Sequence, residues 1–133
     1  CGEAGGSVAS LVEAGNPQAS ADQWDQQIRQ ACITSPIEGL NYLPPGRSSR
    51  GPLSILMDPR LSQVIAALER QHDFVILDAP GVAEFPDALH VGRLADVAVL
   101  ALRINRSTAS SALEARNRLL NLGLPVIGTV LAS

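Results

Sequence analysis

The 133-residue sequence contains no lysine, and all ten of its basic residues are arginine. A phosphate-binding loop of the G-x-x-x-x-G-K-[ST] type needs its lysine as a point charge on the β- and γ-phosphates. Neither that lysine nor that loop is present in this sequence. The stretch from Gly2 to Ser7 is rich in glycine, but no apolar strand precedes it, so we interpret it as a flexible start of the chain.

Several other absences limit the class of protein. The net charge of −3 gives no electrostatic case for nucleic acid or for an acidic membrane surface. No apolar run approaches the length of a membrane span, and the start of the sequence does not resemble a signal peptide. The two cysteines, Cys1 and Cys32, lack the spacing of metal ligands, so a disulfide framework is not expected and a reducing cytoplasm is the default. The length suits a single domain over residues 1–133.

The most informative stretch that is present runs from Phe74 to Gly81, with the sequence FVILDAPG. Four large apolar residues in a row predict a strand that is buried on both faces. The strand would end at the carboxylate of Asp78, before a turn made by Pro80 and Gly81. Ligands of open α/β sheets sit at the carboxyl ends of strands, so Asp78 is a candidate Walker B residue that holds Mg²⁺ beside a nucleotide. A carboxylate that caps the next turn is the alternative.

Helix signals recur along the rest of the chain. Ser7, Ser20, Asp58 and Thr108 are candidate caps, and Pro59 suits the first position of a helix. Apolar residues follow these caps at helical spacing. They include Trp24, Ile28, Ala31 and Cys32 after the second cap, Leu61, Val64, Ile65 and Leu68 after the third, and Ala112, Ala115, Leu119 and Leu122 after the fourth. We interpret Cys32 as a packing residue rather than a reactive thiol.

Strand signals alternate with these helices. Short apolar runs at residues 40–43, 74–77, 97–102 and 126–131 predict four strands. Because each is separated from the next by a helical segment, right-handed crossovers would give a parallel sheet with helices on both faces. The fold class predicted from the sequence is therefore α/β.

Polar residues near the strand ends offer weaker candidates. Arg47 and Arg50 lie in a loop that follows the strand at 40–43 and could meet an anion, although a solvated loop is the simpler interpretation. Asp87 and His90, one helical turn apart, could join Asp78 and Glu84, but their spacing matches no known metal site. His72 has no partner at ligand spacing, so we expect it to be exposed to solvent.

From Gly39 to Leu131 the sequence resembles the cytoplasmic domain of the bacterial tyrosine kinases (BY-kinases) that regulate capsule and exopolysaccharide assembly. Order and spacing agree over about two-thirds of the chain. The motifs that carry the resemblance are Gly39-Leu40, Leu43-Pro44-Pro45-Gly46, His72-Asp73, Asp78-Ala79-Pro80-Gly81, Asp87-Ala88, Ala95-Asp96, Arg103 with Thr108, and Gly128-Thr129-Val130-Leu131.

The resemblance implies a P-loop NTPase-like fold that lacks the P-loop strand, and it carries one functional residue over to this chain. Asp78 takes the role of the Walker B ligand of Mg²⁺. The family's second proline after this aspartate is Gly81, the asparagine that it places near adenine is Ala132, and Tyr42 is the only tyrosine. The phosphate loop and the other acidic and arginine motifs of the family are not in this sequence. Weak binding of MgATP is the most that the resemblance implies.

Two classes of function follow from the resemblance. In the first, the chain is a BY-kinase-like domain of exopolysaccharide or capsule assembly that is non-catalytic as given and acts by contact. Its partner would be a membrane polysaccharide co-polymerase or a second copy, in the cytoplasm at the inner face of the membrane. In the second, it is a fragment of an active ATP-dependent protein tyrosine kinase. Septum-site and partition ATPases share the Asp-x-Pro strand and are a further alternative.

The missing P-loop strand has a structural consequence. In the family it lies in the middle of the sheet, and an uncovered strand edge carries a risk of association. We expect either that the remaining strands close up or that another chain pairs there.

Overall fold

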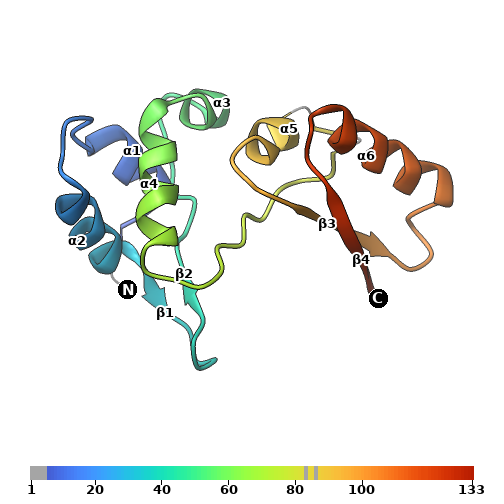
Figure 1. Ribbon diagram of the computed structural model, residues 1–133, viewed down its shortest axis with the longest axis horizontal. Coiled ribbons are helices and arrows are strands. Elements are labelled where there is room, and N and C mark those ends of the chain that lie inside the picture. Colours follow the sequence, from blue (N-terminus) through green and yellow to red (C-terminus); the bar gives the residue numbers. More distant parts are fainter. Residues whose placement is uncertain (1–5, 83, 86) are drawn as a thin grey trace. The chain divides into compact units, whose positions relative to one another are not determined.

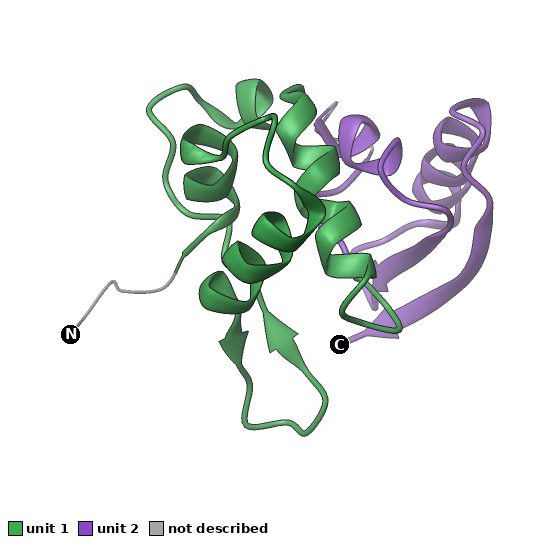
Figure 2. Cartoon of the chain, turned by 60° about the vertical axis from the view of Figure 1, so that its left-hand side comes forward, with its two compact units in different colours: residues 1–75 green, residues 76–133 purple. Residues whose placement is uncertain are grey.

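A computed structural model describes residues 6–82, 84–85 and 87–133 of the chain. Most of the glycine-rich start, with Cys1, and the proline at position 86 lie outside the described residues. The chain divides into two compact units, unit 1 (Cys1–Val75) and unit 2 (Ile76–Ser133), which Figure 2 shows in green and purple. No helix in the described part of the chain is both long enough and apolar enough to cross a membrane.

Unit 1 consists of four helices and a small antiparallel sheet. The helices are α1 (Val8–Ala14), α2 (Ala21–Ala31), α3 (Pro52–Leu56) and α4 (Pro59–Glu69). Their starts agree with the predicted caps. The side chains of Ser7 and Ser20 accept from the backbone three residues later and form capping boxes, and Asp58 caps α4 with Pro59 at its first position. Each of these helix starts depends on residues that are close together in the chain, and for this reason the sequence predicts them.

The core of unit 1 lies between α1, α2 and α4, which pack on one another (Figure 1). Trp24, Ile28 and Ala31 are buried, as the spacing in α2 predicts, and Cys32 at the end of that helix is half-buried. Gly15 ends α1 where a Cβ atom would collide with the side chain of Trp24. The other buried apolar residues of this core are Ala9, Leu11, Val12, Ile55, Leu61, Val64, Ile65 and Ala67.

The sheet of unit 1 differs from the predicted strand at residues 40–43. The two-residue strands β1 (Ile33–Thr34) and β2 (Asn41–Tyr42) pair antiparallel. The turn between them contains Gly39 at φ +78° and closes with a hydrogen bond from the Ser35 amide to the Leu40 carbonyl at 3.0 Å. A connection this short joins antiparallel neighbours, so the prediction of a parallel strand here was wrong.

Unit 2 contains the parallel pairing that the sequence predicts. Its elements are α5 (Asp87–Gly92), β3 (Ala98–Arg103), α6 (Ala109–Asn121) and β4 (Val126–Ala132), and β3 pairs parallel with β4. Thr108 caps α6 through the amide of Ser111, and Gly123 follows the helix at φ +85°. Leu100, Leu119 and Leu124 form the buried cluster between the sheet and α6.

Among the described residues of unit 2, helices cover one face of this sheet. Val99, Ala101 and Val130 on the other face are exposed. The second helical layer that the sequence predicted over β3 and β4 is not formed by the described residues of unit 2. The predicted α/β fold class is confirmed, but in the described part of unit 2 helices lie on one face of the sheet rather than on both.

The predicted strand at residues 74–77 is also not formed. This segment has no regular secondary structure and belongs to no sheet, and 87% of the surface of Phe74 and 86% of that of Ile76 are exposed. A strand needs a neighbour to accept its backbone hydrogen bonds, and none is present among the described residues. The prediction of a central strand buried on both faces was therefore wrong for this chain, although its sequence has the composition of one.

Candidate functional site

Asp78 follows Ile76 and Leu77 in a segment without regular secondary structure, and it is exposed to solvent. It was expected at the carboxyl end of a buried strand, where neighbouring strand ends would surround it. In the described part of the chain no three His, Cys, Asp or Glu side chains lie close enough together to hold a metal ion. A single carboxylate supplies one of the six ligands that Mg²⁺ requires, so phosphate oxygens and water would have to complete the shell. A role for Asp78 as a Mg²⁺ ligand stays a prediction.

The loop after Asp78 turns at Gly81. The amides of Glu84 and Phe85 donate to the Gly81 carbonyl at 3.1 and 3.0 Å. Glu84 is exposed, whereas Asp87 and His90 are half-buried in α5. Of the acidic residues that follow Asp78 in the sequence, Glu84 lies in the turn and Asp87 is the first residue of α5.

The two arginines of the loop at residues 47–50 have different positions. Arg47 is exposed. The guanidinium of Arg50 forms an ion pair with Asp58, with 3.0 Å between Nη1 and Oδ2. This contact uses the charge of Arg50 within unit 1, although 42% of its side chain stays exposed, whereas the described structure shows no ion pair for Arg47.

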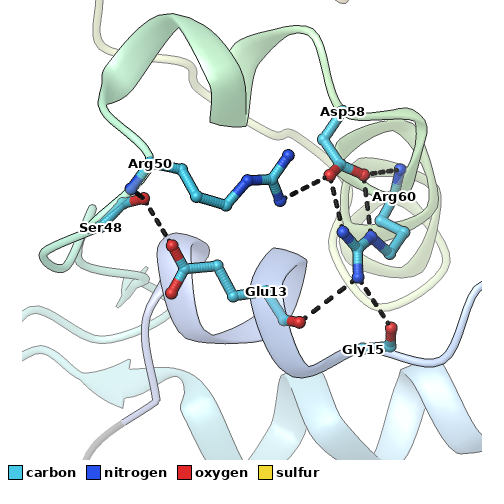
Figure 3. A network of polar contacts seen from close by, with 6 residues as sticks. All are labelled: Glu13, Gly15, Ser48, Arg50, Asp58 and Arg60. Carbon is cyan, nitrogen blue, oxygen red and sulfur yellow. Dashed lines mark hydrogen bonds and ion pairs between the residues drawn. The ribbon is translucent and has the colours of Figure 1, made fainter.

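Asp58 is the centre of a polar network that joins α1, the loop at 47–50 and α4 (Figure 3). Its carboxylate accepts from the Arg60 side chain at two atoms, with Nε to Oδ1 at 2.9 Å and Nη2 to Oδ2 at 2.7 Å. The backbone amide of Arg60 donates to Oδ1 at 3.0 Å. Arg60 also donates through Nη1 to the carbonyls of Gly15 at 3.3 Å and Glu13 at 3.4 Å. The Glu13 carboxylate in turn accepts from the Ser48 hydroxyl at 2.5 Å.

The electrostatics of this network are set by the hydrogen bonds that its central carboxylate accepts, which outweigh the effect of its burial. The Asp58 side chain is 6% exposed, and hydrogen bonds from Arg60 hold its pKa far below the usual range for aspartate. The same hydrogen bonds raise the pKa of Arg60. Charge-assisted bidentate pairs are among the strongest polar contacts in proteins. All these groups are engaged with one another, so the network ties the end of α1 to the start of α4 and offers no open ligand position.

A shallow hollow of about 220 Å³ lies at the other end of unit 1. His72 is half-buried at its wall, where Nδ1 lies 3.1 Å from the Leu68 carbonyl and Nε2 lies 3.1 Å from the Asn41 amide nitrogen. The prediction of a solvent-exposed His72 without partners was wrong, because the sheet brings Asn41 next to the end of α4. The residues that line the hollow are Arg29, Cys32, Thr34, Asn41, Gln71 and His72.

Cys32 in this hollow does not have the properties of a reactive thiol. Partial burial raises its pKa, so the nucleophilic thiolate is less populated than in a free cysteine. This supports the interpretation of Cys32 as a packing residue.

Sequence reasoning did not predict the pairing of His72 with Asn41 or that of Arg60 with Asp58. An arginine two residues after a capping aspartate is the one local signal that could have indicated the second pair.

The fold that these units share with solved structures is that of P-loop NTPase-like kinase domains. The VpsO kinase domain matches 98% of this chain and 59% of its own with a TM-score of 0.78 at 18% identity. The BceF tyrosine kinase domain matches 94% of this chain and 48% of its own with a TM-score of 0.72 at 26% identity. These likenesses confirm the fold class predicted from the sequence.

Proteins that are related to this chain in sequence are also bacterial tyrosine kinases. Tyrosine-protein kinase wzc of Salmonella typhimurium is 26% identical over 107 residues, which is 80% of this chain and 15% of wzc. Tyrosine-protein kinase etk of Escherichia coli is 28% identical over 93 residues, which is 70% of this chain and 13% of etk. No protein-family model matches the sequence. The chain is a relative of the bacterial tyrosine kinases, and it spans about one seventh of the length of wzc and of etk.

Proposed function

We propose that this chain is a BY-kinase-like domain of exopolysaccharide or capsule assembly, and that its 133 residues by themselves act by contact rather than by phosphoryl transfer. The relationship to wzc and etk supports the first part of the proposal. The absence of lysine supports the second, since the sequence contains neither the P-loop lysine nor the loop that holds this lysine against the phosphates.

The position of Asp78 supports the same proposal. Phosphoryl transfer consists almost entirely of positioning the phosphates and neutralising their charge. A carboxylate on an exposed segment that belongs to no sheet is not held in place for that task, and Mg²⁺ sites of this kind depend on substrate phosphates for the rest of their shell. The chain alone is therefore expected to bind MgATP very weakly.

A second candidate function is that of one part of an active ATP-dependent protein tyrosine kinase. The observation in its favour is that the chain matches only a small part of the length of wzc. The matched segment is 15% of wzc, a protein named as a tyrosine kinase. If these residues work together with a phosphate loop on further polypeptide, Asp78 would act as the Walker B ligand of Mg²⁺ in the assembled site.

The partners that we propose are those expected of a domain that takes part in capsule assembly. We infer that the domain works in the cytoplasm at the inner face of the membrane, in contact with a membrane polysaccharide co-polymerase or with a second copy of itself. The exposed apolar side chains of the described residues, among them Phe74, Ile76, Ile127 and Leu131, would supply contact area of the kind that protein interfaces bury.

Titration calorimetry with MgATP tests the proposal on the purified chain. We expect no saturable heat at micromolar protein, and the variant Asp78→Asn should behave like the wild type. Asp96→Asn is the matched control, since Asp96 is also an exposed aspartate of unit 2. Submillimolar binding that Asp78→Asn abolishes and Asp96→Asn preserves would overturn the non-catalytic proposal. It would mean that arginines, with Arg47 the first candidate, replace the lysine.

A further inference from the structure

The hollow of unit 1 lies where two helices end beside the small sheet. α2 and α4 both finish next to β1 and β2 (Figure 1), and all four segments contribute to its wall. The lining residues are Arg29 and Cys32 at the end of α2, Thr34 and Asn41 on the two strands, and Gln71 and His72 just after α4. The proposed function gives none of these side chains a role, so the hollow can be considered on its own chemistry.

Three backbone carbonyls beside the hollow are already engaged as acceptors. Gln71 Nε2 donates to the Asp25 carbonyl at 3.2 Å and to the Ala67 carbonyl at 3.1 Å. The Leu68 carbonyl accepts from the Gln71 amide at 3.0 Å, and His72 Nδ1 lies 3.1 Å from it. Free carbonyls near the C-terminal end of a helix repel an anion. These contacts therefore weaken the main electrostatic obstacle to an anion in the hollow.

Most of the hydrogen-bonding groups that remain open on the wall are donors. In the described structure the guanidinium of Arg29 and the hydroxyl of Thr34 make no hydrogen bond or ion pair. His72 Nδ1 faces a carbonyl and so carries the proton of the neutral ring, which leaves Nε2 to accept from Asn41 Nδ2 at 3.1 Å. Asn41 keeps a second amide N–H for a ligand. Gln71 Oε1 is an open acceptor, since the hydrogens of its Nε2 are used.

The charge at the hollow is positive. Arg29 is permanently protonated, and among the described residues no Asp or Glu side chain lines the hollow. Asp25, one turn before Arg29 on α2, is neutralised by Arg70, with 2.6 Å between Nη2 and Oδ1. Asp73 is exposed and does not belong to the wall. A guanidinium with free N–H groups matches the paired oxygens of a carboxylate or a phosphate.

We propose that this hollow binds a small oxyanion that also carries a hydroxyl group. Arg29 holds the oxyanion, Thr34 and Asn41 donate to it, and Gln71 Oε1 accepts from the hydroxyl. Thr34 and Asn41 are cross-strand partners, so their side chains lie on the same face of the sheet. Pockets for drug-sized ligands measure about 300–1,000 Å³, so a hollow of about 220 Å³ suits a molecule of a few carbon atoms. The inference is independent of the proposed function, since Asp78 does not line the hollow.

An NMR titration of the whole chain tests the proposal. The probes are glycerol 3-phosphate and glycerate, which join a phosphate or a carboxylate to hydroxyl groups. We expect saturable shifts of the Cys32, Thr34 and Gln71 amides at millimolar concentration. Glycerol, which has no charge, should produce no saturable shift. Propionate, which has the carboxylate of glycerate without its hydroxyl groups, should bind about threefold more weakly or worse, as the loss of one hydrogen bond predicts.

Matched arginine variants locate the site. Arg29→Gln should weaken the binding of either probe about tenfold or more, because it removes the charge-assisted contacts. Arg47→Gln makes the same change of charge at an exposed arginine in the loop at 47–50 and should leave the affinity unchanged. Thr34→Val keeps the shape of the side chain and should weaken binding about threefold. Arg29 and Thr34 are both exposed and make no side-chain hydrogen bonds in the described structure, so the spectra of these variants without probe should match that of the wild type.

Three outcomes would overturn the proposal. These are the absence of saturable shifts with both probes, binding of glycerol or propionate as tight as that of glycerate, and equal weakening by Arg29→Gln and Arg47→Gln. Tighter binding of glycerol 3-phosphate would assign the site to a phosphate, and tighter binding of glycerate would assign it to a carboxylate. Failure of the proposed function would appear as MgATP binding that Asp78→Asn abolishes, whereas binding in the hollow depends on Arg29, so the two failures are distinguishable.

Discussion

At the scale of single residues, Asp58 stands out because its carboxylate accepts from the side chains of both Arg50 and Arg60. We expect Asp58→Ala to lower the free energy of unfolding by about 2 kcal/mol, because it removes the cap of α4 and leaves Arg60 without its bidentate partner. Urea denaturation measures the change. Glu114→Ala is the control, since it breaks an exposed i,i+4 pair with Arg118 and should cost less than about 0.5 kcal/mol. Equal effects of the two variants would show that the Asp58 network adds no stability.

The depressed pKa of Asp58 predicts a dependence of stability on pH. A carboxylate whose pKa is lower in the folded than in the unfolded state stabilises the fold above its unfolded pKa of about 4. This contribution decreases as the pH falls from about 4 toward the folded pKa. The difference in urea midpoint between wild type and Asp58→Asn should therefore be largest above pH 5 and shrink at pH 3. A difference that grows on acidification would contradict the assignment. Asp25, whose pKa is lowered by Arg70, remains in both proteins and does not affect the comparison.

Predictions from sequence at this scale succeed for local contacts and fail for distant ones. Asp58 as a cap was predictable because the cap, Pro59 and the helix are neighbours in the chain. Its pairing with Arg50, and that of His72 with Asn41 across 31 residues, depends on how distant segments meet. No pattern in a single sequence encodes those encounters.

At the scale of elements, the segment from Phe74 to Leu77 shows how a strand depends on its neighbours. Its exposure reverses the expectation of a strand buried on both faces, in which truncating Ile76 would cost about 2–5 kcal/mol. We now expect Ile76→Ala to change the free energy of unfolding by less than about 0.5 kcal/mol. Leu100→Ala, in the buried cluster of unit 2, should cost about 2–4 kcal/mol in the same urea denaturation. A large loss for Ile76→Ala would mean that its side chain is buried in solution.

Helices were predicted better than strands for the same physical reason. Each helix satisfies its own backbone, and the caps at Ser7, Ser20 and Thr108 lie within a few residues of the groups that they bind. A strand requires a partner from elsewhere in the chain. The sequence identified four strands by composition, and the structure forms only those for which a partner is present.

At the scale of the whole molecule, the division into two units predicts unequal local stability. Unit 1 buries most of the core residues, whereas unit 2 has a small cluster around Leu100, Leu119 and Leu124. We expect amides in α2 and α4 to exchange more slowly than those in β3 and β4, since sparsely packed regions open at lower free energy. Exchange followed by mass spectrometry measures both. Uniform rates across the chain, or faster exchange in unit 1, would contradict this expectation.

The fold class and the relationship to BY-kinases were predictable because motifs such as Asp78-Ala79-Pro80-Gly81 and Gly128-Thr129-Val130-Leu131 keep their order along the chain. The division at Val75 was not visible, because the apolar run that spans it is typical of a buried strand. The prediction of a single domain over residues 1–133 and the metal role of Asp78 stay predictions.

The exposed segment around Phe74 has a consequence for the life of the protein in a cell. Chaperones and proteases of the quality-control system recognise exposed peptide segments that display large apolar side chains. A chain that presents Phe74 and Ile76 in this form offers them such a peptide without unfolding first. Its abundance would then depend on how much of it is covered by a partner, so that uncovered copies are removed and the amount of chain follows the amount of partner.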